Sequence, residues 1–445
     1  MTANIEAGER ERGLIRALSP WGLGAAIANM IIGTGIFLLP ARMAAAVGGA
    51  APFYYGACAI GIGAVALCFA EAGSRIAVSG GISACVEAAF GRYAGYITSV
   101  SLWLGAGLAA AGVGAAVADT MAHILPIFGQ PAWRDAFIVV LFLTVAAINI
   151  WGVRAGGGLV LVTLTLKLLP LIALVACGAL VLATSGGAAH PVAAAPLAGA
   201  LPAKASVGRA ILLGIFAFMG METALGILGE VRNPARNVPL GLLGALGSVT
   251  VLYILIQLVT AGLLGPDLAA SKTPLADAGR AVFPLLGAVL LAAGAVSMLG
   301  YLSSDMLSAP RILFGMARDG YLPAPLATVH PHTRTPYVAI LTHTTLVVLL
   351  ALTGAFEPLA VLSVLVTLLL YVAGCGAAVV LQRRGVAEEG APMNSRLTPA
   401  AAVIGIVSMT WVALQGTWQE GAAVTATLMI FSLIYVFALR RKTAA

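Results

Sequence analysis

The sequence of 445 residues predicts an all-α membrane protein with twelve transmembrane helices. The composition is the first reason, because 60% of the residues are hydrophobic and only 9% are charged, whereas soluble domains carry roughly 25% charged residues. Apolar segments of about 20 residues also recur along the chain, and that length crosses a bilayer as a helix. Finally, stretches such as Leu286 to Met298 lack the alternation of a membrane β-barrel strand, so helices remain.

The expected spans form one continuous membrane domain. They lie at residues 19–44, 50–76, 94–122, 134–152, 158–184, 206–230, 238–264, 281–310, 336–354, 356–381, 398–416 and 421–439. Glu71 and Asp119, near the ends of spans, are expected to be interfacial structural residues.

The distribution of basic residues predicts the topology. Segments placed in the cytoplasm hold most of the arginines, whereas the outer segments hold only Arg42, Arg134, Lys204, Arg209, Lys272 and Arg280. The positive-inside rule therefore places both termini in the cytoplasm, in agreement with an even number of spans. This topology also accounts for the net charge of +7, since no basic patch interleaved with aromatics indicates nucleic acid. Residues 1–18 show no signal-peptide cleavage site and are expected to be cytoplasmic.

No motif in the sequence indicates metal, redox or nucleotide chemistry. The five cysteines occur singly and without metal-ligand spacing, so we expect them to pack in the interior, and we expect no cofactor. They are Cys58, Cys68, Cys85, Cys177 and Cys375. A GxxxxGK[ST] loop is also missing from the sequence, so any transport would be secondary rather than driven by ATP hydrolysis at a P-loop.

The first span carries a helix-weakening cluster in its middle. Its apolar run reads AAIANMIIGTGIFLLP from Ala25 to Pro40, where two glycines flank Thr34. Each glycine weakens a helix by roughly 1 kcal/mol. One interpretation is a small-residue packing face. The other is an unwound segment, whose free backbone groups are tolerated only where protein or solute satisfies them.

The sixth span has a matching feature. It reads FAFMGMETAL from Phe216, with Gly220 in the middle and Glu222 two positions later. A carboxylate at that depth costs at least about 2.5 kcal/mol, which makes Glu222 a candidate functional residue. Breaks in the first and sixth spans point to a transporter of two inverted five-helix repeats. These repeats would cover 19–184 and 206–383, with two further helices at 398–440.

Four segments resemble the amino acid-polyamine-organocation transporters, which include arginine/agmatine exchangers and cationic amino acid permeases. They are IIGTGIF at 31–37, FAFMGMETA at 216–224 followed by GEVRNPARNVP at 229–239, PRILFGMARDGYLP at 310–323, and the weaker SGGISACVEAAFG at 79–91. The last segment lacks the proline and tyrosines usual in the family, so no substrate contact is assigned to it. The resemblance covers most of the chain and implies a LeuT-like fold.

The resemblance also implies a substrate site at the two breaks. It consists of Ile31, Ile32, Gly33, Thr34 and Gly35 in the first break and of Phe216, Ala217, Phe218, Met219 and Gly220 in the second. The carboxylate of an amino acid would meet Thr34 and Gly35, at the positive end of a half-helix. Its ammonium would meet the carbonyls of Ile31, Phe216 and Met219, and the Phe216 ring would close over the solute from outside.

Four further polar residues are candidates for selectivity and coupling. Asn29 lies near a polar pocket position of the arginine/agmatine exchangers. The resemblance places Asp305 where relatives carry tryptophan, methionine or serine on the pocket floor, where its charge would suit a cationic side chain. Alternatively, Asp305 is a cytoplasmic gate or a partner of Arg311 or Lys167. Lys167 would replace a sodium ion between the first and eighth helices, or it faces a water-filled cavity. Glu222 would take up a coupled proton, or it is a fixed acid that pairs helices; burial favours its neutral form.

The leading hypothesis is a permease or exchanger of amino acids in the inner or plasma membrane, with a mild preference for cationic amino acids or polyamines. One alternative carries neutral amino acids, with Asp305 neutralised by Lys167. A non-transporting receptor or scaffold would need a larger cytoplasmic module than residues 383–396. A channel would need a continuous polar stripe, and an enzyme a recognisable catalytic constellation. Uniport, exchange and proton symport stay open, as do the direction of transport, a homodimer and an accessory subunit.

Overall fold

The computed structural model describes residues 19–33, 35–76, 81–151, 157–184, 204–387 and 391–444, and all regular elements in these ranges are helices. By length and composition, nine helical stretches of the described chain can cross a membrane. Three further apolar helices are shorter, at Gly81–Phe90, Tyr337–Thr353 and Thr398–Ala413. The expected all-α, multi-span class is confirmed.

The helices follow one another along the whole chain. They are α2 (Pro20–Ile31), α3 (Gly35–Val47), α4 (Ala51–Arg75), α5 (Gly81–Phe90), α6 (Arg92–Ile124), α7 (Pro131–Trp151), α8 (Gly157–Thr184), α9 (Lys204–Phe218), α10 (Met221–Ala224), α11 (Pro234–Leu264), α12 (Pro274–Val282), α13 (Pro284–Arg318), α14 (Tyr337–Thr353), α15 (Phe356–Arg383), α16 (Thr398–Ala413) and α17 (Trp418–Ala444). Short 3-10 turns lie at η1 (Gly48–Ala50), η2 (Pro126–Gly129), η3 (Leu225–Glu230), η4 (Gly265–Ala270) and η5 (Ala324–Ala327). The helices α5 and α12 fall between expected spans, and η3 replaces the expected helix end after Ala224.

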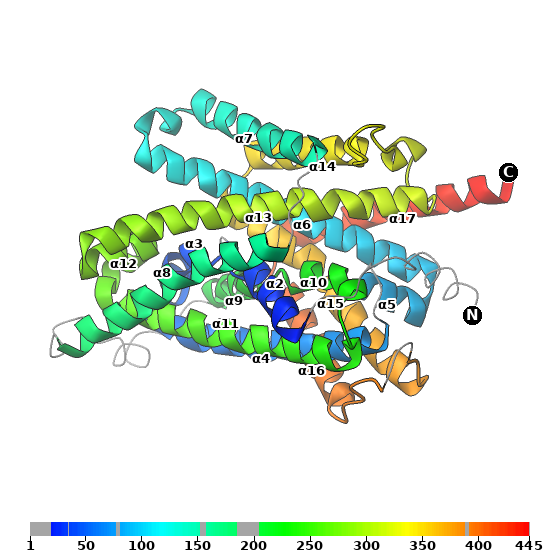
Figure 1. Ribbon diagram of the computed structural model, residues 1–445, viewed down its shortest axis with the longest axis horizontal. Helices are drawn as coiled ribbons and strands as arrows, with labels where there is room; N and C mark the ends of the chain where they lie inside the picture. The colour runs from blue at the N-terminus through cyan, green and yellow to red at the C-terminus, as the bar shows by residue number, and fades with distance from the viewer. Residues whose placement is uncertain are drawn as a thin grey trace.

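The interrupted helices lie at the centre of the bundle. Figure 1 shows α2, α9 and α10 between α13 on one side and α4 and α11 on the other. Close packing of α2 on α11 depends on two glycines: a Cβ on Gly24 would lie 3.3 Å from the carbonyl oxygen of Gly241, and one on Gly241 would lie 3.0 Å from that of Pro20. Small residues let membrane helices approach in this way. The broken segments are therefore held inside protein rather than exposed to lipid.

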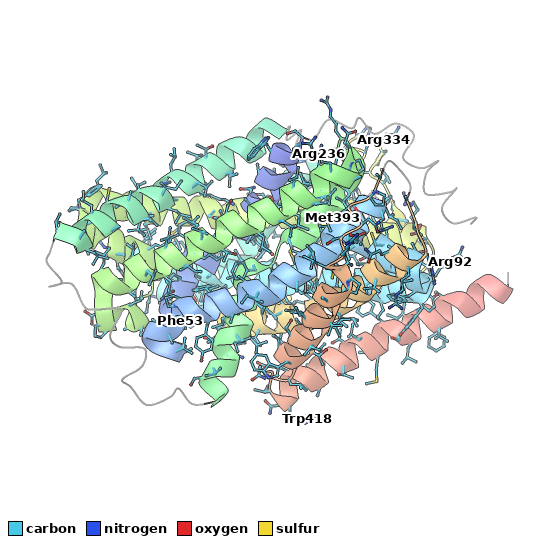
Figure 2. The ribbon with its side chains drawn as sticks, turned by 90° about the horizontal axis from the view of Figure 1, so that it is seen from below. Phe53, Arg92, Arg236, Arg334, Met393 and Trp418 are labelled. Carbon is cyan, nitrogen blue, oxygen red and sulfur yellow. The ribbon has the colours of Figure 1, made fainter. Side chains whose placement is uncertain are left out.

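Arginines expected in the cytoplasm gather at one end of the molecule. Arg92, Arg236 and Arg334 lie toward the same end of the long helices, and Phe53 lies toward the other (Figure 2). A buried ion pair stands in the last turns of α4, where Arg75 Nε donates to Glu71 Oε1 over 2.7 Å. The backbone N–H of Ser395 donates to the other oxygen of Glu71 over 2.9 Å. Glu71 is thus fully buried and joins α4 to the segment before α16.

Candidate functional site

A cavity lies where the two interruptions meet. The helix α2 ends at Ile31 and α3 begins at Gly35, while α9 ends at Phe218 and α10 begins at Met221. The cavity holds about 520 Å³ of empty space, part of it continuous with the surroundings. Its lining is Met30, Ile31, Gly33, Gly35, Gly105, Ala106, Ala109, Val113, Phe216, Met219, Gly220, Glu222, Thr223, Tyr301 and Asp305. It is therefore walled by both breaks, by α6 and by α13.

Gly220 brings the two breaks into direct contact. Its φ is 114°, a left-handed conformation that favours glycine. A Cβ at this position would lie 2.9 Å from the carbonyl oxygen of Met30, one residue before α2 ends. Glycine therefore serves both the backbone turn and the close approach of α10 to α2.

Glu222 stabilises the second break. Its Oε1 accepts from the backbone N–H of Gly220 over 2.9 Å, and its Oε2 accepts from the Tyr371 hydroxyl of α15 over 2.9 Å. Glu222 also lines the cavity. Both expected roles, a fixed helix-pairing acid and a group that faces the solute, are compatible with this position.

The carbonyls at the first break already have protein donors. The Ile31 oxygen accepts from the Tyr253 hydroxyl and from the N–H of Gly33, each over 2.8 Å. Since a carbonyl oxygen has two lone pairs, Ile31 is not free to bind a substrate ammonium in this conformation. Ile32 is buried outside the cavity lining, and its oxygen accepts from Ser297 over 3.3 Å and from Lys167 over 3.2 Å.

Lys167 lies between the first broken helix and α13, where the resemblance placed it. Its Nζ donates to the carbonyls of Asn29 and Ile32, each over 3.2 Å. A Cβ on Gly300 of α13 would lie 4.0 Å from its Cε. Asn29 contributes that carbonyl, but its side chain is not part of the cavity lining, and within the described chain its buried Oδ1 has no hydrogen-bond partner.

Asp305 pairs with a residue that the sequence analysis did not single out. Its Oδ2 lies 2.9 Å from Nε2 of His343 on α14. The Nδ1 of His343 accepts from Nε1 of Trp103 on α6 over 3.0 Å. The expected pairing of Asp305 with Lys167 or Arg311 is therefore wrong: within the described chain, no ion pair joins Asp305 to either residue, and its side chain is hydrogen-bonded to His343 instead.

Phe216 lies in the cavity wall and packs edge-on against Phe356 of α15, with ring centroids 5.6 Å apart. Two helical turns earlier on α9, Arg209 donates to Glu357 over 2.7 Å and to Glu420 over 2.9 Å. These contacts join α9 to the first turns of α15 and α17.

Some residues expected at the second break do not reach the cavity. Met219 and Gly220 line it, but Ala217 and Phe218 do not. Successive residues of a helix point to different faces, and Phe218 instead packs on Tyr253, with centroids 5.6 Å apart. In this structure Ala217 and Phe218 therefore lie outside the cavity lining. Thr34 lies outside the described residues.

Reasoning from the sequence missed His343, Trp103 and Tyr301. His343 carried a usable signal, because an ionisable residue inside an apolar span marks a functional site by default. Tyr301 lies against the first break, where a Cβ on Gly33 would be 3.4 Å from its ring. Trp103 carried no signal of its own.

The chemistry of the cavity suits a small zwitterion or cation. Gly35 begins α3 and lines the cavity, so the N–H groups of a helix N-terminus are available to an anion at this edge. Glu222 and Asp305 supply two acidic groups on the remaining walls.

Comparison with known proteins agrees with this geometry. A family model described as "amino acid permease" matches residues 18–439. The serine/threonine exchanger SteT of Bacillus subtilis is 28% identical over 391 residues, which cover 86% of each chain. The putrescine transporter PotE of Haemophilus influenzae is 27% identical over 391 residues, 84% of this chain and 86% of PotE. The vacuolar cationic amino acid transporter 4 of Arabidopsis thaliana is 34% identical over 187 residues, 40% of this chain and 30% of that protein. The chain belongs to the amino acid permease family of the amino acid-polyamine-organocation superfamily, and it is a multi-pass membrane protein.

Proposed function

We propose that the protein is a secondary transporter of the plasma membrane that moves amino acids by alternating access, with a mild preference for cationic amino acids or polyamines. The cavity at two broken helices supports transport, because such breaks expose backbone donors and acceptors near the middle of the bilayer. Phe216 with Phe356, and Arg209 with Glu357, would close the pathway on one side. Opening of these contacts, with closure of the opposite side, would complete the cycle.

The architecture that we propose for this cycle has twelve membrane spans. Spans one to five at 19–184 and six to ten at 206–383 would form the inverted repeats of a LeuT-like fold, with the last two spans at 398–440. Both termini would lie in the cytoplasm, a proposal supported by the gathering of Arg92, Arg236 and Arg334 at one end (Figure 2). The same fold serves exchange, uniport and proton symport, and it accommodates a homodimer.

One observation supports the cationic preference: Asp305 lines the cavity, and its described side-chain partner is a histidine rather than a lysine or arginine. Lys167, which would neutralise Asp305 in the competing hypothesis, is held by carbonyls of α2 instead. The printed names of PotE and the Arabidopsis relative agree with cationic substrates. The name of SteT favours neutral amino acids, which are the second candidate.

Uptake by purified protein in proteoliposomes tests the preference. Lysine, arginine and putrescine would be compared with serine, leucine and alanine, in the wild type and in Asp305→Asn. We expect Asp305→Asn to reduce uptake of the cations relative to the neutral substrates by about tenfold, as for the loss of one charged hydrogen bond. Asp119→Asn is the matched control, because Asp119 pairs with Arg134 at the far end of α6 and lies outside the cavity lining. An unchanged ratio in Asp305→Asn would exclude the cationic site.

We further propose that Glu222 takes part in proton coupling. It is buried and faces the cavity, and its two carboxylate oxygens accept from Gly220 and from Tyr371 of α15, so movement of α10 relative to α15 would change these hydrogen bonds. A group that changes its hydrogen bonds between two conformations changes its proton affinity between them, which is the requirement for coupling.

A further inference from the structure

Trp103, His343 and Asp305 form a hydrogen-bonded row that ends at the cavity. Nε1 of Trp103 lies 3.0 Å from Nδ1 of His343, and Nε2 of His343 lies 2.9 Å from Oδ2 of Asp305. The exposed fractions of the three residues are 5%, 0% and 2%. They come from α6, α14 and α13, so packing of three helices builds the row.

The row determines which nitrogen of His343 carries hydrogen. An indole N–H can only donate, so Nδ1 of His343 must accept from Trp103. In a neutral imidazole the other nitrogen then carries the hydrogen, and Nε2 donates to Asp305. A second proton on Nδ1 would place two N–H groups face to face at 3.0 Å. His343 therefore holds Asp305 in place without cancelling its charge.

Other titratable groups around Asp305 do not cancel this charge either. Lys167, on α8, donates to carbonyls of α2. Tyr301, on α13 itself, is a neutral phenol, and Glu222 across the cavity is another acid. Arg311 is six residues further along α13, and no ion pair within the described chain joins it to Asp305.

The remaining helices around the row carry their charges elsewhere. The charged side chains of α6 and α7 in the described chain lie near the ends of these helices, at Arg92, Asp119, Arg134 and Asp135. The short η5 has no titratable residue. The Asp277 and Arg280 side chains of α12 pair with each other, and α12 packs around Gly287, roughly five turns of α13 before Asp305.

The second carboxylate oxygen of Asp305, Oδ1, is available to bind a ligand. Within the described chain, the side-chain hydrogen bonds of Asp305 use Oδ2, and no protein donor reaches Oδ1. Asp305 lines the cavity beside Gly105 and Ala106, whose small side chains leave room in front of it. A buried carboxylate without a counter-charge is unfavourable, so a cation is needed there when the cavity closes.

We propose that Trp103, His343 and Asp305 together form a cation subsite, in which Oδ1 of Asp305 binds one cation at a time: either a proton or the ammonium or guanidinium group of a substrate side chain. Trp103 and His343 are positioning residues, which keep Asp305 oriented and negatively charged. The inference rests on the transport function proposed above. It adds that a cationic side chain and a proton exclude each other, so that neutral amino acids enter with Asp305 protonated.

The test compares lysine and leucine uptake in proteoliposomes between about pH 5 and pH 8. In Trp103→Phe, Nδ1 of His343 loses its donor, and the imidazole can take a second proton and pair with Asp305. We expect its lysine-to-leucine ratio to match the wild type at the alkaline end and to fall about tenfold below it at the acid end. His343→Gln keeps an amide N–H for Asp305 and an oxygen for Trp103, but it cannot become a cation. The double variant Trp103→Phe with His343→Gln should therefore lose the added acid sensitivity.

A second comparison does not depend on Trp103. His343→Leu keeps a buried apolar volume but removes the donor to Asp305, so its lysine-to-leucine ratio should fall about tenfold below that of His343→Gln. Thermal unfolding in detergent reports folding in each variant.

Three results would overturn this proposal. The first is an equal pH profile of the lysine-to-leucine uptake ratio in Trp103→Phe and the wild type. The others are a fall of this ratio at acid pH that persists in the double variant, or an equal ratio in His343→Leu and His343→Gln. If instead Asp305→Asn itself leaves the ratio unchanged, the cationic preference proposed above fails. If Asp305→Asn lowers the ratio while the Trp103 and His343 variants do not, the preference stands and only the row is refuted.

Discussion

The replacement of Gly220 by alanine tests whether the two breaks must touch. Gly220 adopts a φ of 114°, and an added Cβ would lie 2.9 Å from the oxygen and 3.0 Å from the carbon of the Met30 carbonyl. The left-handed backbone costs an alanine roughly 1–2 kcal/mol. Forcing a methyl group against backbone atoms adds about 1–3 kcal/mol. We therefore expect Gly220→Ala to lower the free energy of unfolding by about 2–5 kcal/mol.

The same substitution should also impair transport, because relief of the clash moves α10 away from α2 and widens the cavity wall. Thermal unfolding in detergent would measure the stability, and the initial rate of uptake in proteoliposomes would measure the function. Gly244→Ala is the matched control: Gly244 is exposed on α11, and a Cβ there meets nothing within 4 Å. Equal unfolding temperatures and uptake rates in Gly220→Ala and Gly244→Ala would refute the argument that contact between the breaks requires glycine.

Three other substitutions have expected outcomes. Lys167→Met removes a charged donor from two carbonyls of α2 and should cost about 3 kcal/mol or more, measured by thermal unfolding; unchanged stability would contradict its bridging role. Glu222→Gln can keep both hydrogen bonds, since its oxygen accepts at the second break and its amide donates to a Tyr371 hydroxyl that now accepts. We expect it to bind substrate but to lose pH-dependent uptake, and a retained pH dependence would exclude Glu222 from coupling. Glu71→Gln should destabilise the fold by about 3–5 kcal/mol, because it leaves the buried guanidinium of Arg75 without its counter-charge. The control Asp119→Asn changes an exposed ion pair and should alter stability by less than about 1 kcal/mol. Similar unfolding temperatures for the two variants would contradict this expectation.

The helices and their two interruptions were predictable from the sequence because each depends on neighbouring residues. A run of apolar residues specifies a membrane helix, and glycines within that run specify a weak point. The sequence predicts the first break at Ile31 to Gly35 and the second at Phe216 to Gly220; in the structure α2 ends at Ile31 and α9 ends at Phe218. The short helices α5 and α12 were not predicted, since neither is long enough to span a membrane.

The partners of the polar side chains could not be predicted in the same way. Asp305 and His343 are 38 positions apart, and Trp103 is 240 positions from His343, so their contact arises from the packing of α6, α13 and α14. The position of Lys167 beside α2 agrees with the resemblance, because the resemblance carries information about the tertiary structure. Asp305 departs from the residues usual at its position, so the resemblance gave it no partner.

The two breaks differ in whether their backbone carbonyl oxygens can still accept a hydrogen bond from a substrate. At the first break, Tyr253, Lys167 and Ser297 already donate to the ends of α2. These donors come from α11, α8 and α13, and they hold the C-terminal end of α2 in place. At the second break, the Phe216 carbonyl accepts from the N–H of Met219 over 3.2 Å and retains a second lone pair.

A substrate ammonium should therefore bind on the α9 side, at Phe216 and Met219, with its carboxylate at the start of α3. Binding would then pull α9 toward an α2 that does not move, and the Phe216 ring would be carried with it. In this arrangement the first break would stay in place, and the second break would move the Phe216 ring when a substrate binds in the cavity.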